Sequence, residues 1–148
     1  MPVSSSADEL FEKGLQFLRE ENSLAALPCF EKAFIQNKTS RTRSYLGYCI
    51  AAQRGQITDG LQLCREAIGS DPDNPEHYLN LARVYLKAKK KDEAIEALRR
   101  GLSAGENSDI KALLAVLGLR KKPLIPFLSR SHFLNKYIGL ALRRLGLR

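Results

Sequence analysis

Residue types that carry out catalysis are few in this chain and are not arranged as a site. Only two of the 148 residues are histidines, His77 and His132, and neither has a neighbour at the spacing of a catalytic or metal-binding motif. His77 is expected on an exposed face near a helix start. Glu93 and Glu96 lie three residues apart beside two arginines, which indicates a solvated helix face rather than an acid/base pair. No glycine-rich phosphate loop follows an expected strand. The sequence therefore predicts no enzyme, no catalytic residue and no cofactor.

The three cysteines also indicate structure rather than chemistry. Cys29, Cys49 and Cys64 are an odd number and lie at expected helical positions. Because cysteine is among the most buried residue types, we expect small core residues in a reducing compartment. A zinc site would need closely paired ligands, so no metal is expected. The chain has no secretory signal and no apolar run near the roughly 20 residues that span a bilayer, so a cytoplasmic location is expected.

Residues 75–107 have the pattern of an antiparallel helical hairpin. The first helix carries apolar residues on one face: Tyr78, Leu81, Ala82 and Tyr85. Asn74 is expected to cap this helix, with Pro75 at its first position. After a lysine-rich turn, Asp92 is expected to cap a second helix that ends near Gly105.

The hairpin recurs with a period of 34 residues. Small residues share one place in each copy, and a larger residue follows four positions later: Ala26 and Phe30, Gly60 and Cys64, Ala94 and Leu98. This period and order resemble the tetratricopeptide repeat (TPR) family over about residues 7–108.

The resemblance implies an all-α fold, a right-handed superhelical solenoid of antiparallel helix hairpins capped by C-terminal helices. The expected parts are a disordered N-terminus, three repeats and a basic helical capping extension: residues 1–6, then 7–40, 41–74 and 75–108, then 109–148. A second-repeat irregularity leaves two registers open, because Tyr48 stands where the family has Gly or Ala and Gly47 precedes it. The strict register turns Tyr45 and Cys49 toward the inner groove, whereas a one-residue rotation turns Tyr48 there.

The resemblance also implies a protein or peptide partner, bound on the concave face that the first helices of such hairpins line. The positions implied to face this groove are Phe11, Leu15, Leu18, Tyr45, Tyr48, Cys49, Leu79, Arg83 and Leu86. Since only Arg83 among them is cationic, clamping of a terminal carboxylate is not expected. An amphipathic helix or an extended apolar segment fits better. Alternatively, the ends of this chain fill the groove, with Leu15 and Leu18 as core residues.

The net positive charge of the chain lies in its last 40 residues. Residues 1–108 hold 15 Lys+Arg and 15 Asp+Glu, whereas residues 109–148 hold nine Lys+Arg and a single Asp. Besides capping the repeats, this tail is a candidate site for an anionic membrane surface or an acidic partner, which would make the protein a peripheral anchor. The candidate residues are Lys121, Lys122, Arg130, Lys136, Arg143, Arg144 and Arg148. Nucleic acid is not expected as a partner, and the sequence leaves the oligomeric state open.

Overall fold

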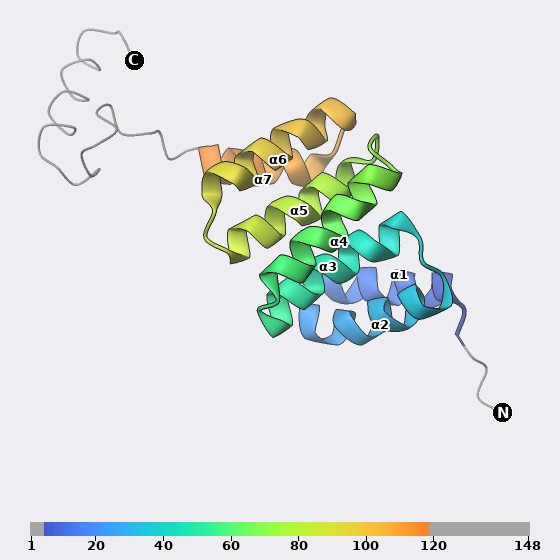
Figure 1. Cartoon of the computed structure of the whole chain (residues 1–148). Coiled ribbons are helices and arrows are strands. Elements are labelled where there is room, and N and C mark those ends of the chain that lie inside the picture. Colours follow the sequence, from blue (N-terminus) through green and yellow to red (C-terminus); the bar gives the residue numbers. More distant parts are fainter. Residues whose placement is uncertain (1–4, 119–148) are drawn as a thin grey trace, which may run out of the picture. The chain divides into compact units, whose positions relative to one another are not determined.

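The computed structural model describes residues 5–118, which form seven α-helices and no strand (Figure 1). The helices are α1 (Ala7–Arg19), α2 (Ser23–Gln36), α3 (Ser40–Arg54), α4 (Ile57–Ser70), α5 (Pro75–Lys87), α6 (Lys91–Ala104) and α7 (Ser108–Gly118). Three antiparallel hairpins, α1–α2, α3–α4 and α5–α6, stack in chain order, and α7 follows as a single described helix. The predicted all-α solenoid is confirmed. No helix in this range is both long enough and apolar enough to cross a bilayer.

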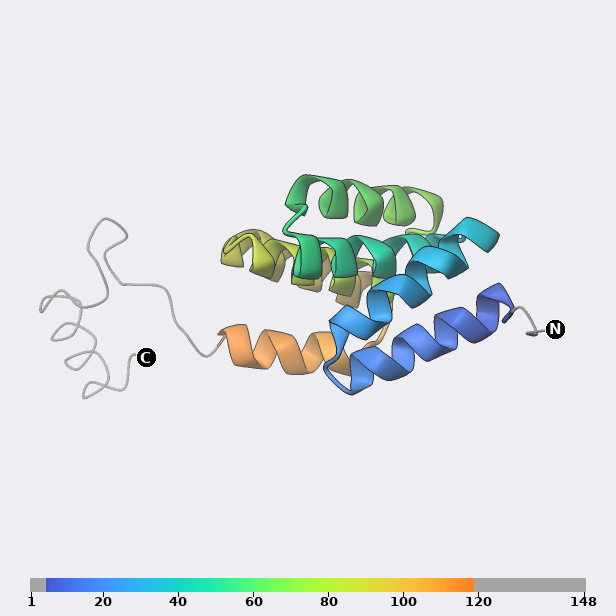
Figure 2. The ribbon, with the colours of Figure 1, turned by 90° about the horizontal axis from the view of Figure 1, so that it is seen from below.

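The 34-residue period of the sequence is also a period of the backbone. The second helices of the hairpins begin at Ser23, Ile57 and Lys91. The turns before them each contain one residue with positive φ, at Glu21, Gly55 and Lys89. As a result, the first helices α1, α3, α5 and α7 all run in the same direction (Figures 1 and 2).

Local sequence signals set most of the helix starts. Ser6 and Glu9 form the capping box that begins α1, with bonds of 3.2 and 3.1 Å between each side chain and the other residue's backbone N–H. The Asn74 side chain accepts the backbone N–H of Glu76 and begins α5. Asn107 begins α7 by accepting the N–H of Ile110.

The prediction that Asp92 caps α6 is wrong. The helix begins at Lys91, so that Lys90 and not Asp92 is the N-cap residue, and Lys90 makes no side-chain cap bond. The left-handed residue Lys89 reverses the chain directly after α5, so Lys90 already accepts the first helical hydrogen bond, from Ala94. Asp92 lies within the first turn, where a negative charge favours the helix dipole.

The second hairpin takes the rotated register. Gly47, rather than Tyr48, lies at the crossing of α3 and α4, where a Cβ on Gly47 would come within 2.8 Å of the Gly60 carbonyl oxygen. Two glycines therefore allow the closest approach between the helices of this hairpin. The three cysteines are buried, as predicted, and Cys49 and Cys64 belong to the two hydrophobic clusters of the core.

Candidate functional site

The first helices of the hairpins line one groove, with a volume of about 820 Å³. Figure 2 shows α1 and α7 on the same side of α3 and α5, so the superhelical stacking brings both ends of the described chain to one surface. The lining residues are Leu15, Leu18 and Arg19 from α1, Tyr45 and Tyr48 from α3, Glu76, Leu79, Arg83, Leu86 and Lys87 from α5, and Asp109, Ala112, Leu113 and Val116 from α7.

Seven of the nine residues implied to face the groove lie along it: Leu15, Leu18, Tyr45, Tyr48, Leu79, Arg83 and Leu86. Phe11 and Cys49 do not, because both are buried in the core, at 6% and 0% exposure. The Phe11 ring packs edge-on against Phe30 and Tyr45, with ring centroids 5.5 and 5.4 Å away. The rotated register was expected to turn only Tyr48 of α3 toward the groove, but Tyr45 lines it as well.

The open apolar surface of the groove differs from the predicted one. Tyr45 and Leu79 are only 7% and 3% exposed, so they form its floor and present little area to a partner. The half-buried residues Leu15, Leu18, Tyr48 and Leu86 are more accessible. Helix α7 adds two residues: Leu113, which is half-buried, and Val116, which is 67% exposed. Leu15 and Leu18 pack against the core and are at the same time partly accessible to a ligand. The alternative that the ends of the chain fill the groove concerns residues outside the described range.

Three cations lie along the groove, not one. The Arg83 guanidinium lies 5.3 Å above the Tyr48 ring, and its Nη1 donates to Asn80 Oδ1 at 3.2 Å. Arg19 and Lys87 were missed by the sequence reasoning, although each follows a groove position by four residues, one helical turn along α1 and α5. Within residues 5–118, none of the three has an acidic group within 4 Å.

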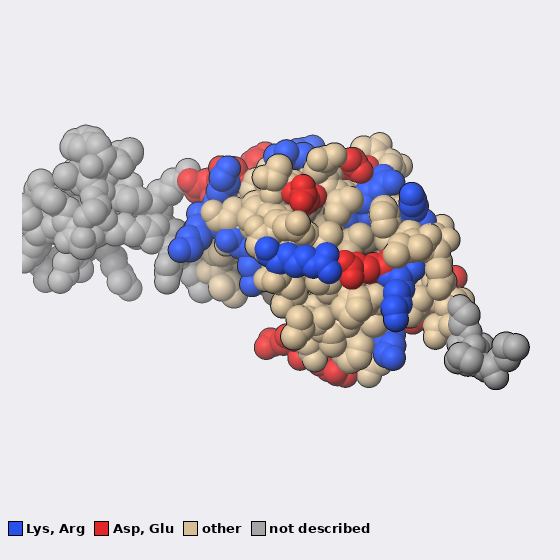
Figure 3. Space-filling view, turned by 60° about the horizontal axis from the view of Figure 1, so that its bottom comes forward, with Lys and Arg blue, Asp and Glu red and all other residues tan. Residues whose placement is uncertain are grey.

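Two acidic residues also line the groove, Glu76 and Asp109. Arg41 binds the Glu76 carboxylate through Nε at 3.0 Å and Nη2 at 3.4 Å, while its guanidinium lies 4.7 Å above the Phe11 ring. Asp109 has no basic group within 4 Å among the described residues. Figure 3 shows one face of the molecule, on which a short row of basic and acidic groups crosses a mostly uncharged surface.

A buried polar network joins α3 to α5. His77 Nδ1 lies 2.9 Å from Ser44 Oγ, and Asn80 Nδ2 donates to the same oxygen at 3.3 Å. His77 Nε2 lies 3.3 Å from Asp71 Oδ2 but is not aligned for a hydrogen bond. The network ends at Arg83, which Asn80 holds over the groove.

The expectation that His77 is exposed is wrong, because its side chain is fully buried. The small Ser44 side chain on α3 leaves room for the imidazole between the helices. Burial lowers the pKa of His77, since the charged form loses its hydration, while the nearby Asp71 carboxylate acts in the opposite direction. His77 is a residue of the helix interface.

The groove contains no arrangement for nucleophilic or metal chemistry within the described residues. Burial raises the pKa of the Cys49 and Cys64 thiols to about 12, which keeps both protonated and unreactive at neutral pH. No group of three His, Cys, Asp or Glu side chains in residues 5–118 could hold a metal ion. What the groove offers is shape, apolar contact and charge.

The basic tail candidates from Lys121 to Arg148 lie outside the described residues. Of the predicted extension 109–148, the structure describes only the part within α7. This part contributes four residues to the groove and packs Ile110 into the core.

Similar structures have the same fold. The first TPR of Spaghetti (RPAP3), bound to the HSP90 peptide SRMEEVD, is 16% identical, with a TM-score of 0.59 over 77% of this chain and 94% of that one. YrrB, a TPR protein with an unusual peptide-binding site, is 21% identical, with a TM-score of 0.58 over 77% of this chain and 58% of that one. The Yersinia enterocolitica type III secretion chaperone SycD, in complex with a peptide of the translocator YopD, is 18% identical, with a TM-score of 0.55 over 80% and 98%. At these identities the likeness concerns the fold alone.

No curated protein matches this sequence. Two family models described as tetratricopeptide repeat do match it, over residues 11–75 and 51–117. Together they cover residues 11–117, which include most of α1 and of α7 and all of the helices between them, in agreement with the backbone period of 34 residues. The chain belongs to the tetratricopeptide repeat family.

Proposed function

We propose that this protein is a non-enzymatic interaction module that binds an amphipathic helix or an extended apolar segment of a partner protein in the groove between α1, α3, α5 and α7. The observation that carries the proposal is the groove itself. Four helices from different repeats line one open surface with accessible apolar side chains and cations that have no acidic partner among the described residues. Such a surface suits a partner segment that buries apolar side chains and supplies charge.

The solved structures support binding of a protein segment in general. The Spaghetti repeat domain and SycD are each bound to a peptide, of HSP90 and of YopD respectively. Because this chain is less than a quarter identical to either protein, their ligands do not identify the partner of this chain. The groove differs from the carboxylate clamp that a dense set of cations and amides would form, since half of its lining residues are leucines and tyrosines.

A crosslinking experiment tests this proposal. A photoreactive amino acid placed at Leu18 should capture the partner from cells of the source organism, whereas the same amino acid at Ile35, which is 76% exposed on α2 outside the groove, should not. The captured segment should then bind the purified chain. Replacing Tyr48 and Leu86 with Ala should weaken its binding at least tenfold, which corresponds to about 1.4 kcal/mol.

The matched control for that double variant replaces Leu24 and Ile35 with Ala, two exposed residues of α2. It removes similar apolar area from another face and should leave the affinity unchanged. Both variants should keep the helix content of the parent. Equal affinity for the groove variant and the parent would exclude the groove as the binding site.

The charge of residues 109–148 favours a second candidate function. This segment holds nine basic residues and one acidic residue, so we propose as an alternative that it attaches the protein to an anionic membrane surface or an acidic partner. The two functions are compatible, since one uses the groove and the other uses the charge of the tail.

A further inference from the structure

The charged residues of the groove are ordered along its length. Arg19 is the last residue of α1, Lys87 is the last residue of α5, and Arg83 lies one turn before it. The acidic residues occupy the opposite places, with Glu76 second in α5 and Asp109 second in α7. All first helices run in the same direction (Figures 1 and 2). The basic residues therefore lie at the end of the groove formed by the helix C-termini, and the acidic residues lie at the end formed by the helix N-termini.

Helix dipoles explain why such charges lie at helix ends, but not why they face the groove. Acidic residues are favourable near the start of a helix and basic residues near its end. That preference is satisfied on any face of the helix. Here, all five charged side chains line one surface that four helices share.

Ion pairing within the protein neutralises only one of the five charged residues of the groove, so both ends of the groove keep a charge. Arg41 already neutralises Glu76, so Asp109 carries the charge of the acidic end. At the basic end, Arg19, Arg83 and Lys87 have no acidic group within 4 Å in the described part of the chain. Arg83 is also held in place by Asn80 and by the Tyr48 ring, so it loses little side-chain freedom when it binds a charge.

We propose that the groove binds its partner segment in one direction only. Acidic side chains of the partner lie at the end formed by Arg19, Arg83 and Lys87, and a basic side chain lies near Asp109. Apolar side chains between them contact Tyr48, Leu86 and Leu113. The reversed orientation brings like charges together, which disfavours it and makes the charge order a determinant of specificity. This inference rests on the proposed function and deepens it by specifying the chemistry of the partner.

Selection from a display library of random 16-residue peptides tests the inference without knowledge of the partner. The full chain and the variant Arg83→Glu/Lys87→Glu serve as two targets. Peptides selected on the parent should combine aliphatic residues with acidic residues toward one end and basic residues toward the other. Peptides selected on the variant should lose the acidic end or replace it with lysine and arginine.

The best parent-selected peptide then gives the quantitative test. Its affinity should fall at least tenfold on Arg83→Glu/Lys87→Glu and should recover when its acidic residues are changed to lysine. A matched control, Lys32→Glu/Arg99→Glu, makes the same charge change at two exposed residues outside the groove and should retain the parent affinity. Circular dichroism should show the same helix content for all three proteins.

The outcomes separate this inference from the proposed function. Suppose that parent-selected peptides lose affinity for the Tyr48→Ala/Leu86→Ala variant. If they nevertheless have no charge order, or bind Arg83→Glu/Lys87→Glu with unchanged affinity, the proposal of groove binding stands and the directional inference is overturned. If they bind Tyr48→Ala/Leu86→Ala as well as the parent, both are overturned. Failure to enrich any peptide on the parent counts against both as well.

Discussion

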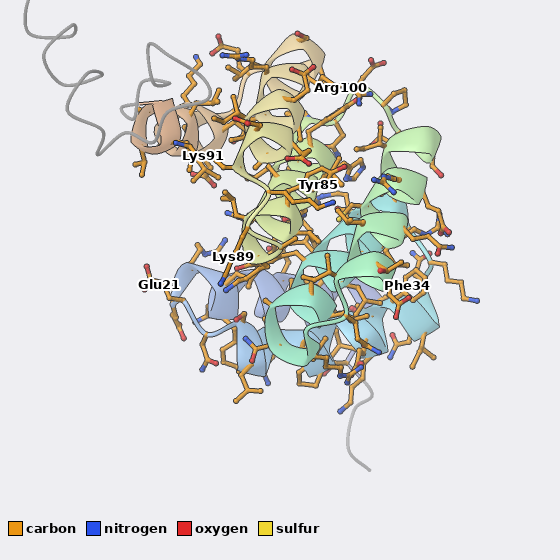
Figure 4. All side chains as sticks on the ribbon, turned by 60° about the vertical axis from the view of Figure 1, so that its left-hand side comes forward. Glu21, Phe34, Tyr85, Lys89, Lys91 and Arg100 are labelled. Carbon is orange, nitrogen blue, oxygen red and sulfur yellow. The ribbon has the colours of Figure 1, made fainter. Side chains whose placement is uncertain are left out.

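Glu21 and Lys89, both labelled in Figure 4, occupy the turns of the first and third hairpins with φ of 57° and 59°. In the second hairpin the equivalent residue is Gly55, with φ of 67°. Backbone hydrogen bonds from residues 89 and 90 to Leu86 and Tyr85 close the end of α5, and equivalent bonds close α1. Glu21 and Lys89 thus adopt the left-handed backbone conformation that favours glycine, because the chain must reverse direction in the same way in each hairpin.

Replacing Lys89 with Gly should therefore stabilise the protein. The left-handed conformation costs a residue with a side chain about 1–2 kcal/mol, and the greater freedom of glycine in the unfolded chain offsets part of the gain. We expect a net increase of about 0.5–1 kcal/mol in the free energy of unfolding, measured by urea denaturation. Gly55→Ala should lower it by a similar amount. A loss of stability in Lys89→Gly would contradict this account.

His77 should make the stability depend on pH. Its folded-state pKa is lowered by burial, so the unfolded chain binds the proton more readily. The contribution of this residue is fully present above the unfolded pKa of about 6.5 and declines as the pH falls through that value toward the lower folded pKa. Urea midpoints at pH 7.5 and pH 5.5 should differ more in the parent than in His77→Gln. Equal differences would show that the buried imidazole does not titrate with folding.

At the scale of elements, the crossing of α3 and α4 depends on two glycines. A Cβ on Gly60 would lie 2.6 Å from the Gly47 carbonyl oxygen and 2.9 Å from the Ala51 Cβ. These are backbone and core atoms, so the helices themselves would have to move apart. In the first hairpin, by contrast, a Cβ on Gly14 would meet the Phe30 side chain and not the backbone of α2.

Gly60→Ala should lower the free energy of unfolding by about 1–3 kcal/mol, because it overpacks this crossing. The matched control is Gly69→Ala in the same helix, where a Cβ would meet nothing within 4 Å. There the better helix propensity of alanine should raise stability by about 0.5 kcal/mol. Thermal or urea unfolding measures both. Similar effects of the two substitutions would rule out close packing as the reason for Gly60.

At the scale of the whole molecule, the charge is divided between a neutral repeat region and a basic tail. Residues 1–108 contain equal numbers of basic and acidic residues, so the excess of +8 belongs to residues 109–148. Binding through such a charge excess depends on ionic strength, since exposed charges are screened over about 8 Å at physiological salt.

The full chain should bind vesicles that contain anionic lipid at low salt and dissociate as salt increases, as measured by vesicle sedimentation. Lys136→Glu/Arg143→Glu should reduce this binding strongly. Lys32→Glu/Arg99→Glu, with the same net charge, should reduce it much less if the tail carries the interaction. Equal losses in the two variants would indicate a general effect of net charge, and binding to uncharged vesicles would indicate a mechanism other than charge.

The sequence by itself determined the hairpins, their 34-residue period and most helix starts. These depend on local patterns: apolar spacing within one helix, a capping side chain such as Asn74, and small residues repeated in phase. The second-repeat irregularity at Gly47 and Tyr48 is also visible in the sequence, although the local pattern does not determine its register. The placement of Asp92 failed because the backbone reversal at Lys89 determined where α6 begins.

Only the tertiary structure decided which side chains the groove presents. Phe11 and Cys49 turn into the core because the rotation of a helix depends on contacts with other helices, which the repeat pattern of one unit does not specify. Arg19 and Lys87 join the groove, and α7 contributes Asp109 and Leu113, because stacking three hairpins brings residues nearly a hundred positions apart to one surface. His77 is buried for the same reason, since its partner Ser44 comes from the preceding repeat. Such contacts between repeats follow from packing geometry and not from local sequence.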